Sequence, residues 1–386
     1  MTNLKLLLLS LLFVLLFSAC TNNDPIQARK DLLGPGDYGR ILALQLASLG
    51  SDTSLGKVEN AGRGFYLVAG NLKGVQSQFL IRFAGFSGAV KKAQLALPIH
   101  LFTGAGNDFS PSVHRVTGNW QEDSVTAAKF NSQFDPATVG TRLSVGLDSL
   151  RKNSDKDTLW FNLDSTLVQS WIADTTMNFG LLINSPAPEL LVEYHSRHGA
   201  SKVPRLKLVL TQSTGRDTTL FFAANADAAI FSRTLALPED RFYIGNGEQF
   251  KTYLAFAPLD TIPSNATINH AELRLSIDTT LSINSRDGFN FAVDSVLAIS
   301  DSNATLKFTV GFLPITLSSV LATDQTLTLN LTTLTQSWLL LPDKNRGLLI
   351  QSTNPTRNLS RVAFFADRNR PELAPRLLID YTLPPK

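Results

Sequence analysis

The chain has 386 residues, of which 44% are hydrophobic and 17% are charged, and its formal net charge is +3. This balance supplies enough apolar material for a core and excludes wholesale disorder. The charges are of mixed sign, with no block of Lys or Arg that would follow a phosphate backbone, so we expect no nucleic-acid partner. A single cysteine excludes an internal disulfide.

The N-terminus has the features of the signal peptide of an exported lipoprotein. Lys5 precedes an apolar run, residues 6–17, that is too short to span a bilayer, and the run leads into Ser18-Ala19-Cys20. Small residues directly before a cysteine resemble a lipobox, in which the thiol is acylated and the chain is cut before it. We therefore predict a signal peptide over residues 1–19 and a membrane anchor through a lipid on Cys20, in the cell envelope, with the outer membrane as the expected location. The alternatives are an ordinary signal peptide, or a start of the chain buried in the membrane, each with a chance cysteine.

Residues 20–37 are polar and rich in Asn, Asp, Pro and Gly, which predicts a tether between the lipid and the folded part. The segment Gly34-Pro-Gly-Asp-Tyr-Gly39 fits the spacing of a dinucleotide-binding loop. That loop requires a strand before it and a helix after it, and a tether supplies neither. We predict no nucleotide cofactor.

Beyond the tether, short runs rich in Leu, Val, Phe and Thr alternate with polar residues and are separated by Gly, Asn, Asp, Ser and Pro. Phe79–Phe83 and Leu206–Leu210 are examples. This texture is typical of antiparallel strands, and sustained helical periodicity is hard to find. The sequence predicts an all-β protein built from jelly-roll-like sandwiches.

An internal repeat divides the chain. Gln169-Ser-Trp171 and Asn178-Phe-Gly180 recur as Gln336-Ser-Trp338 and Asn345-Arg-Gly347 at the same spacing. Later, Pro204-Arg-Leu206 recurs as Pro375-Arg-Leu377, and upstream Phe79-Leu80 corresponds to Tyr253-Leu254. We predict two tandem units over residues 38–212 and 218–384, joined by the polar segment 213–217.

The repeated landmarks have structural roles in this interpretation. Trp171 and Trp338 each follow a leucine by four residues, so one short helical turn would turn both side chains to the core. Gly180 and Gly347 precede apolar triplets and suit a backbone angle that other residues avoid. The expected helix caps are Ser165 and Thr332.

With Val113-His-Arg-Val116 and Asn119-Trp120-Gln-Glu122 in the first unit, these motifs resemble the DNRLRE domain family. The resemblance covers both units, although the second lacks the central segment. It implies jelly-roll-like sandwiches of secreted bacterial proteins that occur beside polysaccharide-active enzymes, some of them similar to carbohydrate-binding modules.

Trp120 and Glu122 are the candidate ligand-binding residues. An exposed aromatic ring can stack on the apolar side of a sugar while neighbouring carboxylates and amides bond its hydroxyls, and Trp120 is surrounded by such groups in sequence. The alternative is that Trp120 packs at a sheet edge as part of the fold.

Motifs for catalysis are missing from the sequence. It has no G-x-S-x-G, P-loop or H-E-x-x-H, and Cys20 is assigned to the lipid, so we predict no catalytic residues and no enzyme activity. His195 and His198 could bind a metal from a loop, and residues 301–303 could form part of a calcium loop. Neither has the density of ligands that such sites use, so we predict no metal.

The sequence thus favours a non-catalytic envelope lipoprotein whose tandem modules bind polysaccharide. One alternative is a structural or adhesive surface subunit that docks protein partners along its sheet edges. Another is a hydrolase or lyase with an unrecognised site, which would need a cluster of acidic residues and histidine in a pocket.

Overall fold

The computed structural model describes residues 40–48, 53–55, 62–143, 147–152, 156–186, 188–199, 202–211, 215–302, 305–366 and 370–384. The predicted signal peptide, the tether and Cys20 lie outside these ranges. Strands account for 51% of the described residues and helices for 11%, and the sheets are antiparallel, so the predicted all-β sandwich fold is confirmed. Within the described ranges no helix has both the length and the apolar content needed to cross a membrane.

The first sandwich, called sandwich 1 below, has two layers that share the long strand β5. One layer runs β13-β12-β5-β9-β8, and the other continues from β5 through β11, β3, β4, β10, β6 and β7, with β14 on the free side of β4. Its strands are β3 (Tyr66–Leu72), β4 (Val75–Arg82), β5 (Ala89–Thr103), β6 (Ser112–Val116), β7 (Phe134–Thr138), β8 (Gly140–Arg142), β9 (Thr158–Leu163), β10 (Leu181–Asn184), β11 (Leu190–His195), β12 (Arg205–Thr211), β13 (Asp217–Ala223) and β14 (Ala226–Arg233). Its helices are α3 (Ala127–Phe130), α4 (Leu147–Lys152), α5 (Ser165–Ala173) and the short 3-10 turn η1 (Thr175–Met177).

Sandwich 2 repeats this plan in smaller sheets. One layer runs β1-β24-β17-β21, and the others contain β19-β18-β22-β16-β2, with β20 on β18, and the pair β15-β23. Its strands are β1 (Arg40–Ala47), β2 (Thr53–Leu55), β15 (Arg241–Asn246), β16 (Lys251–Leu254), β17 (Thr267–Ser276), β18 (Phe289–Ser302), β19 (Thr305–Val310), β20 (Thr316–Val320), β21 (Thr326–Asn330), β22 (Leu348–Ser352), β23 (Ser360–Phe365) and β24 (Arg376–Leu383). Its helices are α6 (Thr332–Leu340) and the 3-10 turn η2 (Pro342–Lys344).

The internal repeat is visible in three dimensions. Trp171 on α5 and Trp338 on α6 occupy the seventh position of helices of equal length, and each is 1% exposed in the core of its sandwich. The glutamine two residues before each tryptophan also accepts an equivalent hydrogen bond in both sandwiches. Gln169 Oε1 accepts a hydrogen bond from Val90 N at 2.7 Å, and Gln336 Oε1 accepts one from Ile268 N at 2.8 Å. These amides fix each helix to the first part of the adjoining strand.

The repeated glycines have the backbone angle that the sequence predicts. Gly180 has φ of +88° and Gly347 has φ of +81°. A Cβ atom at Gly180 would lie 2.3 Å from the carbonyl oxygen of Ile81, and one at Gly347 would lie 2.4 Å from that of Leu254. Both the angle and the close approach therefore require glycine at the entry to β10 and β22.

The predicted helix caps are wrong by one or two residues. Asp164 caps α5 by accepting a hydrogen bond from Thr166 N, and Asn330 Oδ1 accepts one from Thr332 N before α6. A carboxylate or amide oxygen reaches the free N–H groups of the first turn as well as a hydroxyl does, so the choice was open in the sequence.

The first two strands of each predicted unit pair with strands of the other unit. The sequence places β1 and β2 in the first unit and β13 and β14 in the second, because they precede β3 and β15 along the chain. In the structure β1 pairs with β24 and β2 with β16, whereas β13 pairs with β12 and β14 with β4. Sandwich 2 is thus completed by β1 and β2, which precede sandwich 1 in the chain. Sandwich 1 is completed by β13 and β14, which precede sandwich 2.

The two exchanged strand pairs occupy equivalent places in identical register. Thr53 lies seven positions after Leu46, and Ala229 lies seven positions after Phe222. Their partners are Leu377 for Leu46, Leu206 for Phe222, Tyr253 for Thr53 and Phe79 for Ala229. These partners are the residues that the sequence repeat had already matched to one another, so the exchange belongs to the duplicated plan.

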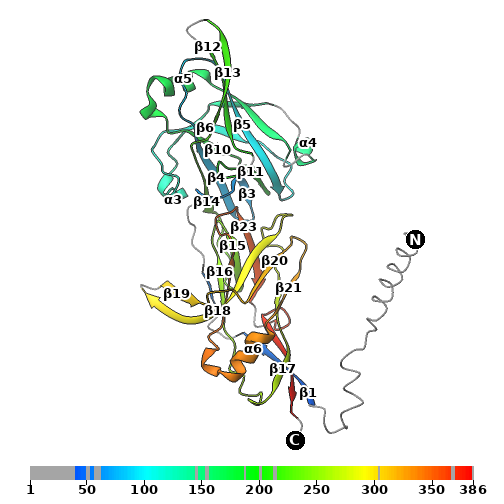
Figure 1. Ribbon diagram of the computed structural model, residues 1–386. Coiled ribbons are helices and arrows are strands. Elements are labelled where there is room, and N and C mark those ends of the chain that lie inside the picture. The colour runs from blue at the N-terminus through cyan, green and yellow to red at the C-terminus, as the bar shows by residue number, and fades with distance from the viewer. Residues whose placement is uncertain are drawn as a thin grey trace, which may run out of the picture.

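Connectivity explains the exchange. Strand β12 ends at the far tip of sandwich 1, and the chain must return along the whole sandwich to reach sandwich 2 (Figure 1). Strands β13 and β14 make that return as part of the sheets, so their backbone groups are paired instead of being left in a long loop. Strands β1 and β2 run along sandwich 2 in the same way before the chain enters β3.

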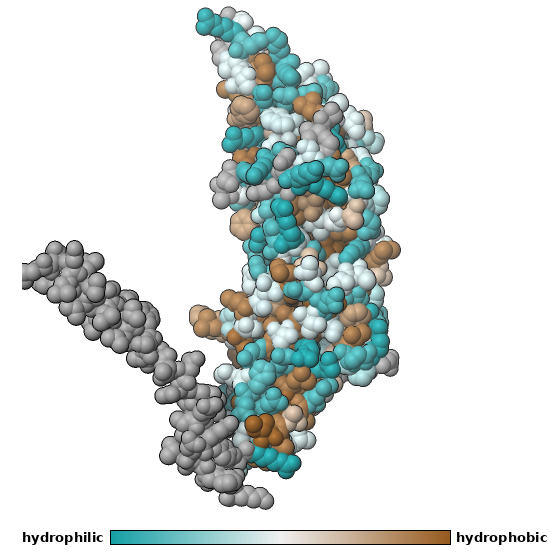
Figure 2. All heavy atoms as spheres, turned by 90° about the vertical axis from the view of Figure 1, so that its right-hand side faces the viewer, coloured by the Kyte–Doolittle hydropathy of each residue, from teal (hydrophilic) through white to brown (hydrophobic). Residues whose placement is uncertain are grey.

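The two sandwiches are stacked end to end in an elongated molecule (Figure 1). Strand β1 begins with Arg40, whose partner is Leu383 near the end of β24, at the end of the rod farthest from β12 and β13. The part of the chain that precedes Arg40 therefore joins the rod on sandwich 2. On the face seen in Figure 2, hydrophobic side chains form small groups among hydrophilic ones and no continuous band.

We predict that residues 62–233 fold alone, whereas residues 38–212 do not. The first fragment keeps β14, which buries Ile230 and Phe231 at 5% and 2% exposure, and the second loses it and leaves the long edge of β4 open. Urea unfolding followed by circular dichroism should give one cooperative transition for the first fragment and none for the second. A cooperative transition of equal midpoint for residues 38–212 would mean that β1 and β2 can replace β13 and β14 on sandwich 1.

Candidate functional site

Trp120 does not offer the exposed ring that sugar stacking would need. Its side chain is 4% exposed, Nε1 donates to the carbonyl oxygen of Phe179 at 2.7 Å, and the guanidinium of Arg82 lies 5.2 Å from its ring centre. The ring packs with Val116, Leu182 and Ala228 in a small apolar cluster on the outside of β4, β6 and β10. The structure therefore corrects the proposed stacking role and matches the alternative, in which Trp120 is part of the fold.

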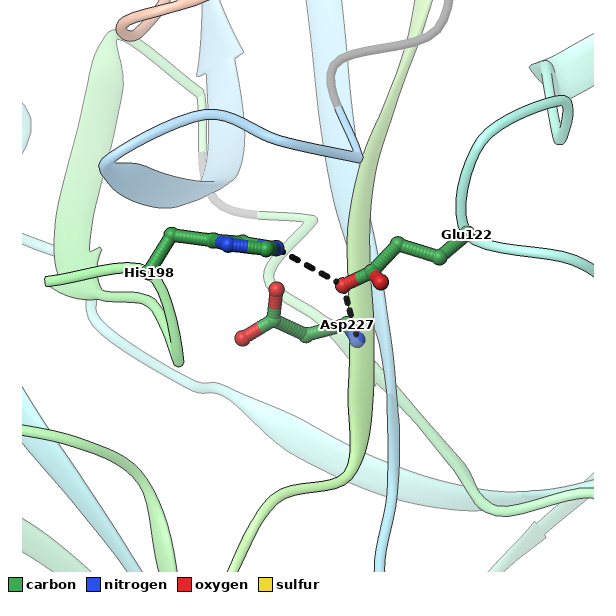
Figure 3. Close-up of side chains that lie close together, drawn as sticks. All are labelled: Glu122, His198 and Asp227. Atoms are coloured by element: carbon green, nitrogen blue, oxygen red, sulfur yellow. Dashed lines mark hydrogen bonds and ion pairs between the residues drawn. The ribbon is translucent and has the colours of Figure 1, made fainter.

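Glu122 lies in a cluster with His198 and Asp227 (Figure 3), and Arg197 also contacts its carboxylate. Its carboxylate accepts two hydrogen bonds from Arg197, from Nε and Nη2, both at 2.7 Å. It also accepts from the Asp227 N–H at 3.1 Å and lies 3.0 Å from His198 Nε2, while Asp227 Oδ2 accepts from Arg197 N at 2.6 Å. The cluster therefore ties the loop after β6 and the loop after β11 to β14, one of the exchanged strands.

The spacing of the ligand atoms in this cluster would suit a metal ion, but the guanidinium of Arg197 already provides a positive charge there. Ligand atoms of Glu122, His198 and Asp227 lie within 4.8 Å of one another. Both oxygens of Glu122 are engaged by the Arg197 guanidinium, which would repel a second positive charge. The arrangement is a structural ion pair that holds β14 in place.

The two carboxyls of the cluster have pKa values moved in opposite directions. Burial raises the pKa of Asp227 to about 7, although the hydrogen bond from Arg197 N acts against the rise. Burial would also raise the pKa of Glu122, but the hydrogen bonds from Arg197, Asp227 N and His198 outweigh it, so that pKa is lowered. Separated pKa values are typical of acid and base pairs in enzymes. Asp227 is 1% exposed, however, so a substrate cannot reach it.

His195 does not join His198, the other histidine that the sequence offers as a metal ligand. Its ring lies 5.7 Å from that of Tyr66 and 5.4 Å from that of His100, at the junction of the two sandwiches. Tyr66 and His100 stack at 4.0 Å, and His100 Nε2 lies 3.0 Å from Asp287 of sandwich 2. This aromatic group thus forms part of the contact between the sandwiches.

Glu193 is buried at the same junction. It is 2% exposed, its Oε1 accepts a hydrogen bond from Asn358 Nδ2 at 3.1 Å, and its Oε2 has no hydrogen-bond partner. Burial raises the pKa of Glu193 to about 8, with the Asn358 hydrogen bond acting against the rise. A hollow beside it, about 350 Å³ including its open mouth, is lined by residues of both sandwiches.

The outer face of sandwich 1 carries a second set of aromatic side chains. On β9 the inward residues are Leu159, Phe161 and Leu163, so Trp160 points outward and is half-buried. Lys207 of β12 places its Nζ 5.8 Å from the Trp160 ring centre and 5.9 Å from that of Phe221 on β13. Phe221 is 53% exposed. We call the surface formed by Trp160, Lys207 and Phe221 the aromatic face.

Amide groups adjoin the aromatic face. Gln94 of β5 is opposite both Lys207 and Asn162, and its Nε2 donates to Asn162 Oδ1 at 2.8 Å. Arg205, one row further along β12, is exposed. Rings, amides and cations therefore share one solvent-facing side of the sheet.

Sandwich 2 has no aromatic residue at the equivalent positions. The strand registers place Thr328 where sandwich 1 has Trp160, Leu378 where it has Lys207, and Gln45 where it has Phe221. Glu272 occupies the position of Gln94 and forms an ion pair with Arg274 at 2.7 Å. The aromatic face is therefore a feature of sandwich 1 alone. The equivalent surface of sandwich 2 serves as a comparison that lacks the rings.

The sequence contained a signal for the aromatic face, but that signal lies outside the repeated motifs. Alternation in Thr158–Leu163 predicts that Trp160 points away from the core, but Trp160 is not repeated and belongs to no motif. Phe221 lies in the segment that the sequence placed in the second unit, so its position beside Trp160 depends on the strand exchange.

Comparison of the chain with protein-family models gives no match, and comparison with curated proteins gives no relative. The resemblance to the DNRLRE family therefore stays a prediction.

We predict that Asp227→Asn weakens the pH dependence of stability. The unfolded chain releases this proton near pH 4 and the folded protein near pH 7, so the folded state holds more protons in between. The free energy of unfolding of the natural protein therefore falls as pH rises through this window, and the variant lacks that fall. The stability of the variant relative to the natural protein should increase by on the order of 2–4 kcal/mol across the window, measured by urea unfolding.

Asp123→Asn is the control for this measurement, because Asp123 is exposed and its pKa is lowered by Arg63. Glu193 is present in the natural protein and in both variants, so its contribution to the pH dependence cancels when their free energies of unfolding are subtracted. Parallel stability curves for the natural protein and Asp227→Asn would contradict the assignment.

Proposed function

We propose that the protein is a non-catalytic lipoprotein of the cell envelope that binds polysaccharide through the aromatic face. The observation that carries the proposal is the pair of outward rings, Trp160 and Phe221, with Lys207 between them. Aromatic rings stack on the apolar side of a pyranose, and ammonium and amide groups bond its hydroxyls. The face lies on an open sheet, which suits a long chain ligand better than a small enclosed one.

The position of the aromatic face supports this proposal. Lipid on Cys20 would tether the protein through Arg40, at the sandwich 2 end of the rod. Strands β12 and β13 lie on sandwich 1 at the opposite end (Figure 1). The aromatic face is therefore on the sandwich that lies away from the anchor, where a polysaccharide outside the membrane can reach it.

The buried carboxyls support a binding role over an enzymatic one. Asp227 and Glu193 have the most unusual carboxyl pKa values among the described residues, and they are 1% and 2% exposed. The partly exposed Glu122 is held by Arg197 in a bidentate pair. A general acid or base must reach its substrate, and none of these three does.

We predict that Trp160→Ala lowers affinity for a bound polysaccharide at least about tenfold, since a buried aromatic contact at the centre of an interface contributes more than 1.4 kcal/mol. Glycan-array screening of the natural protein identifies the polysaccharide, and isothermal titration measures the loss. Phe312→Ala is the control, because Phe312 is a fully exposed ring on sandwich 2. Equal affinity for Trp160→Ala and the natural protein would remove the aromatic face as the site.

We also predict that Cys20→Ser releases the protein from the membrane fraction. Without a thiol there is no lipid, and no other anchor is expected from the sequence. Fractionation with detergent partitioning measures this, and metabolic labelling with a palmitate analogue should be lost in the variant. Retention of Cys20→Ser in the membrane would count against the lipid anchor.

A second candidate function, a structural or adhesive subunit with a protein partner, is favoured by one apolar group on sandwich 2. Phe312, Leu313 and Leu317 are 100%, 73% and 66% exposed where β19 leads into the edge strand β20. Exposed apolar side chains beside an open strand edge are typical of protein docking. Failure to bind any glycan, together with loss of self-association in Phe312→Ala, would favour this function.

A further inference from the structure

The hollow at the junction of the two sandwiches, called the junction hollow, is a small polar space. Its walls come from both sandwiches, with Tyr66, His100 and Glu193 from sandwich 1 and Asn246, Asp287 and Asn358 among those from sandwich 2. The enclosed space has room for about one water-sized guest. A sugar does not fit, so this site is separate from the aromatic face.

One wall of the junction hollow carries an unsatisfied carboxylate oxygen. Glu193 is 2% exposed, and its Oε2 has no hydrogen-bond partner. A buried carboxylate is costly unless a cation, a proton or hydrogen bonds compensate it. Asn358 compensates only Oε1. Oε2 is therefore the atom in this hollow that most needs a partner.

The remaining walls supply hard oxygen donors. Asp287 contributes a second carboxylate from the opposite sandwich, and Asn246, Asn358 and Ser352 add amide and hydroxyl oxygens. Asn246 Nδ2 donates to Asn358 Oδ1 at 2.8 Å, and Ser352 Oγ donates to Asn246 Oδ1 at 2.5 Å. Cysteine sulfur is absent from these walls. Carboxylate, amide and hydroxyl oxygens completed by water are the ligands that calcium takes, usually six to eight of them.

The cationic residues of the junction hollow do not satisfy Glu193. Arg357 turns its guanidinium over the Tyr66 ring, 5.7 Å from the ring centre, and no ion pair joins it to Glu193. His100 Nε2 faces Asp287 at 3.0 Å, and Arg286 is 3.8 Å from the other oxygen of Asp287. His100 and Arg286 therefore lie on the Asp287 side, and the charge of Arg357 acts on Glu193 without forming an ion pair with Oε2.

We propose that the junction hollow binds a calcium ion, with Glu193 Oε2 as its buried ligand and Asp287 as the ligand from the other sandwich. This departs from the absence of a metal that the sequence motifs predict, because the two carboxylates lie 94 positions apart in the chain and no motif joins them. An ion held from both sides links sandwich 1 to sandwich 2 and resists bending of the rod at the junction.

Calcium titration of the purified, chelator-treated protein tests this proposal. Thermal unfolding is followed while CaCl₂ is added above pH 8, where Glu193 is ionised, with NaCl added to keep ionic strength constant. We expect the unfolding midpoint to rise and saturate over roughly 0.1–1 mM calcium, the range of extracellular modules. No rise at any calcium concentration would overturn the proposal.

Glu193→Gln keeps the size of the side chain and the oxygen that Asn358 bonds, and it should lose the calcium response. Glu239→Gln, which removes the same charge from an exposed residue, should keep it. If Glu193→Gln does not unfold cooperatively in the absence of metal, Asp287→Asn takes its place and should shift the response to higher calcium. An unchanged response in the Glu193 or Asp287 variant would overturn the site.

Terbium provides a readout that does not depend on stability. Tb³⁺ replaces calcium at oxygen sites, and its emission is excited through a nearby aromatic ring such as Tyr66, which lines the hollow. We expect saturable emission from the natural protein that added calcium displaces, and none from Glu193→Gln. Emission of equal strength from Glu193→Gln would place the ion elsewhere and overturn the proposal.

Discussion

The pairing of β1 with β24 and of β13 with β12 is the constraint on which the rest of the molecule depends. Each pair closes one layer of a sandwich with a strand from the segment preceding the other unit. Because the strands are part of the sheets, the chain crosses the junction twice without a long loop. Neither unit as written in the sequence contains all the strands of its own sandwich. The two are therefore joined by sheet hydrogen bonds and shared cores.

Polar groups at the junction reinforce this dependence. Arg361, which is fully buried, pairs with Glu248 at 3.0 Å and also donates to the carbonyl oxygen of Lys73 on sandwich 1. Arg233, at the end of the exchanged strand β14, binds the same glutamate at 2.9 Å. Removing one member of such a network leaves a buried charge without a partner, which costs more than the pair contributes. The junction is consequently specific in orientation, and Glu193 lies within it.

The candidate sites follow from strand geometry. Trp120 follows β6 in a segment that folds onto β14, so its ring is covered, whereas Trp160 sits at an outward position of β9 and stays accessible. The Glu122 cluster has the composition of a metal or acid–base site, but Arg197 supplies its positive charge. What distinguishes the aromatic face is that two rings and Lys207 meet on an open sheet and that the second copy lacks them.

Residue patterns alone determined the all-β class, the duplication, the buried tryptophans Trp171 and Trp338 and the glycines at φ above +80°, because strand alternation and backbone sterics act locally. The partners of β1 and β13, the burial of Trp120 and the meeting of Trp160 with Phe221 were decided only in three dimensions. Each exchanged strand pair finds an equivalent acceptor strand in either repeat. From the sequence, two alternative strand pairings therefore have similar local energy. The path of the chain between the stacked sandwiches selects one of them.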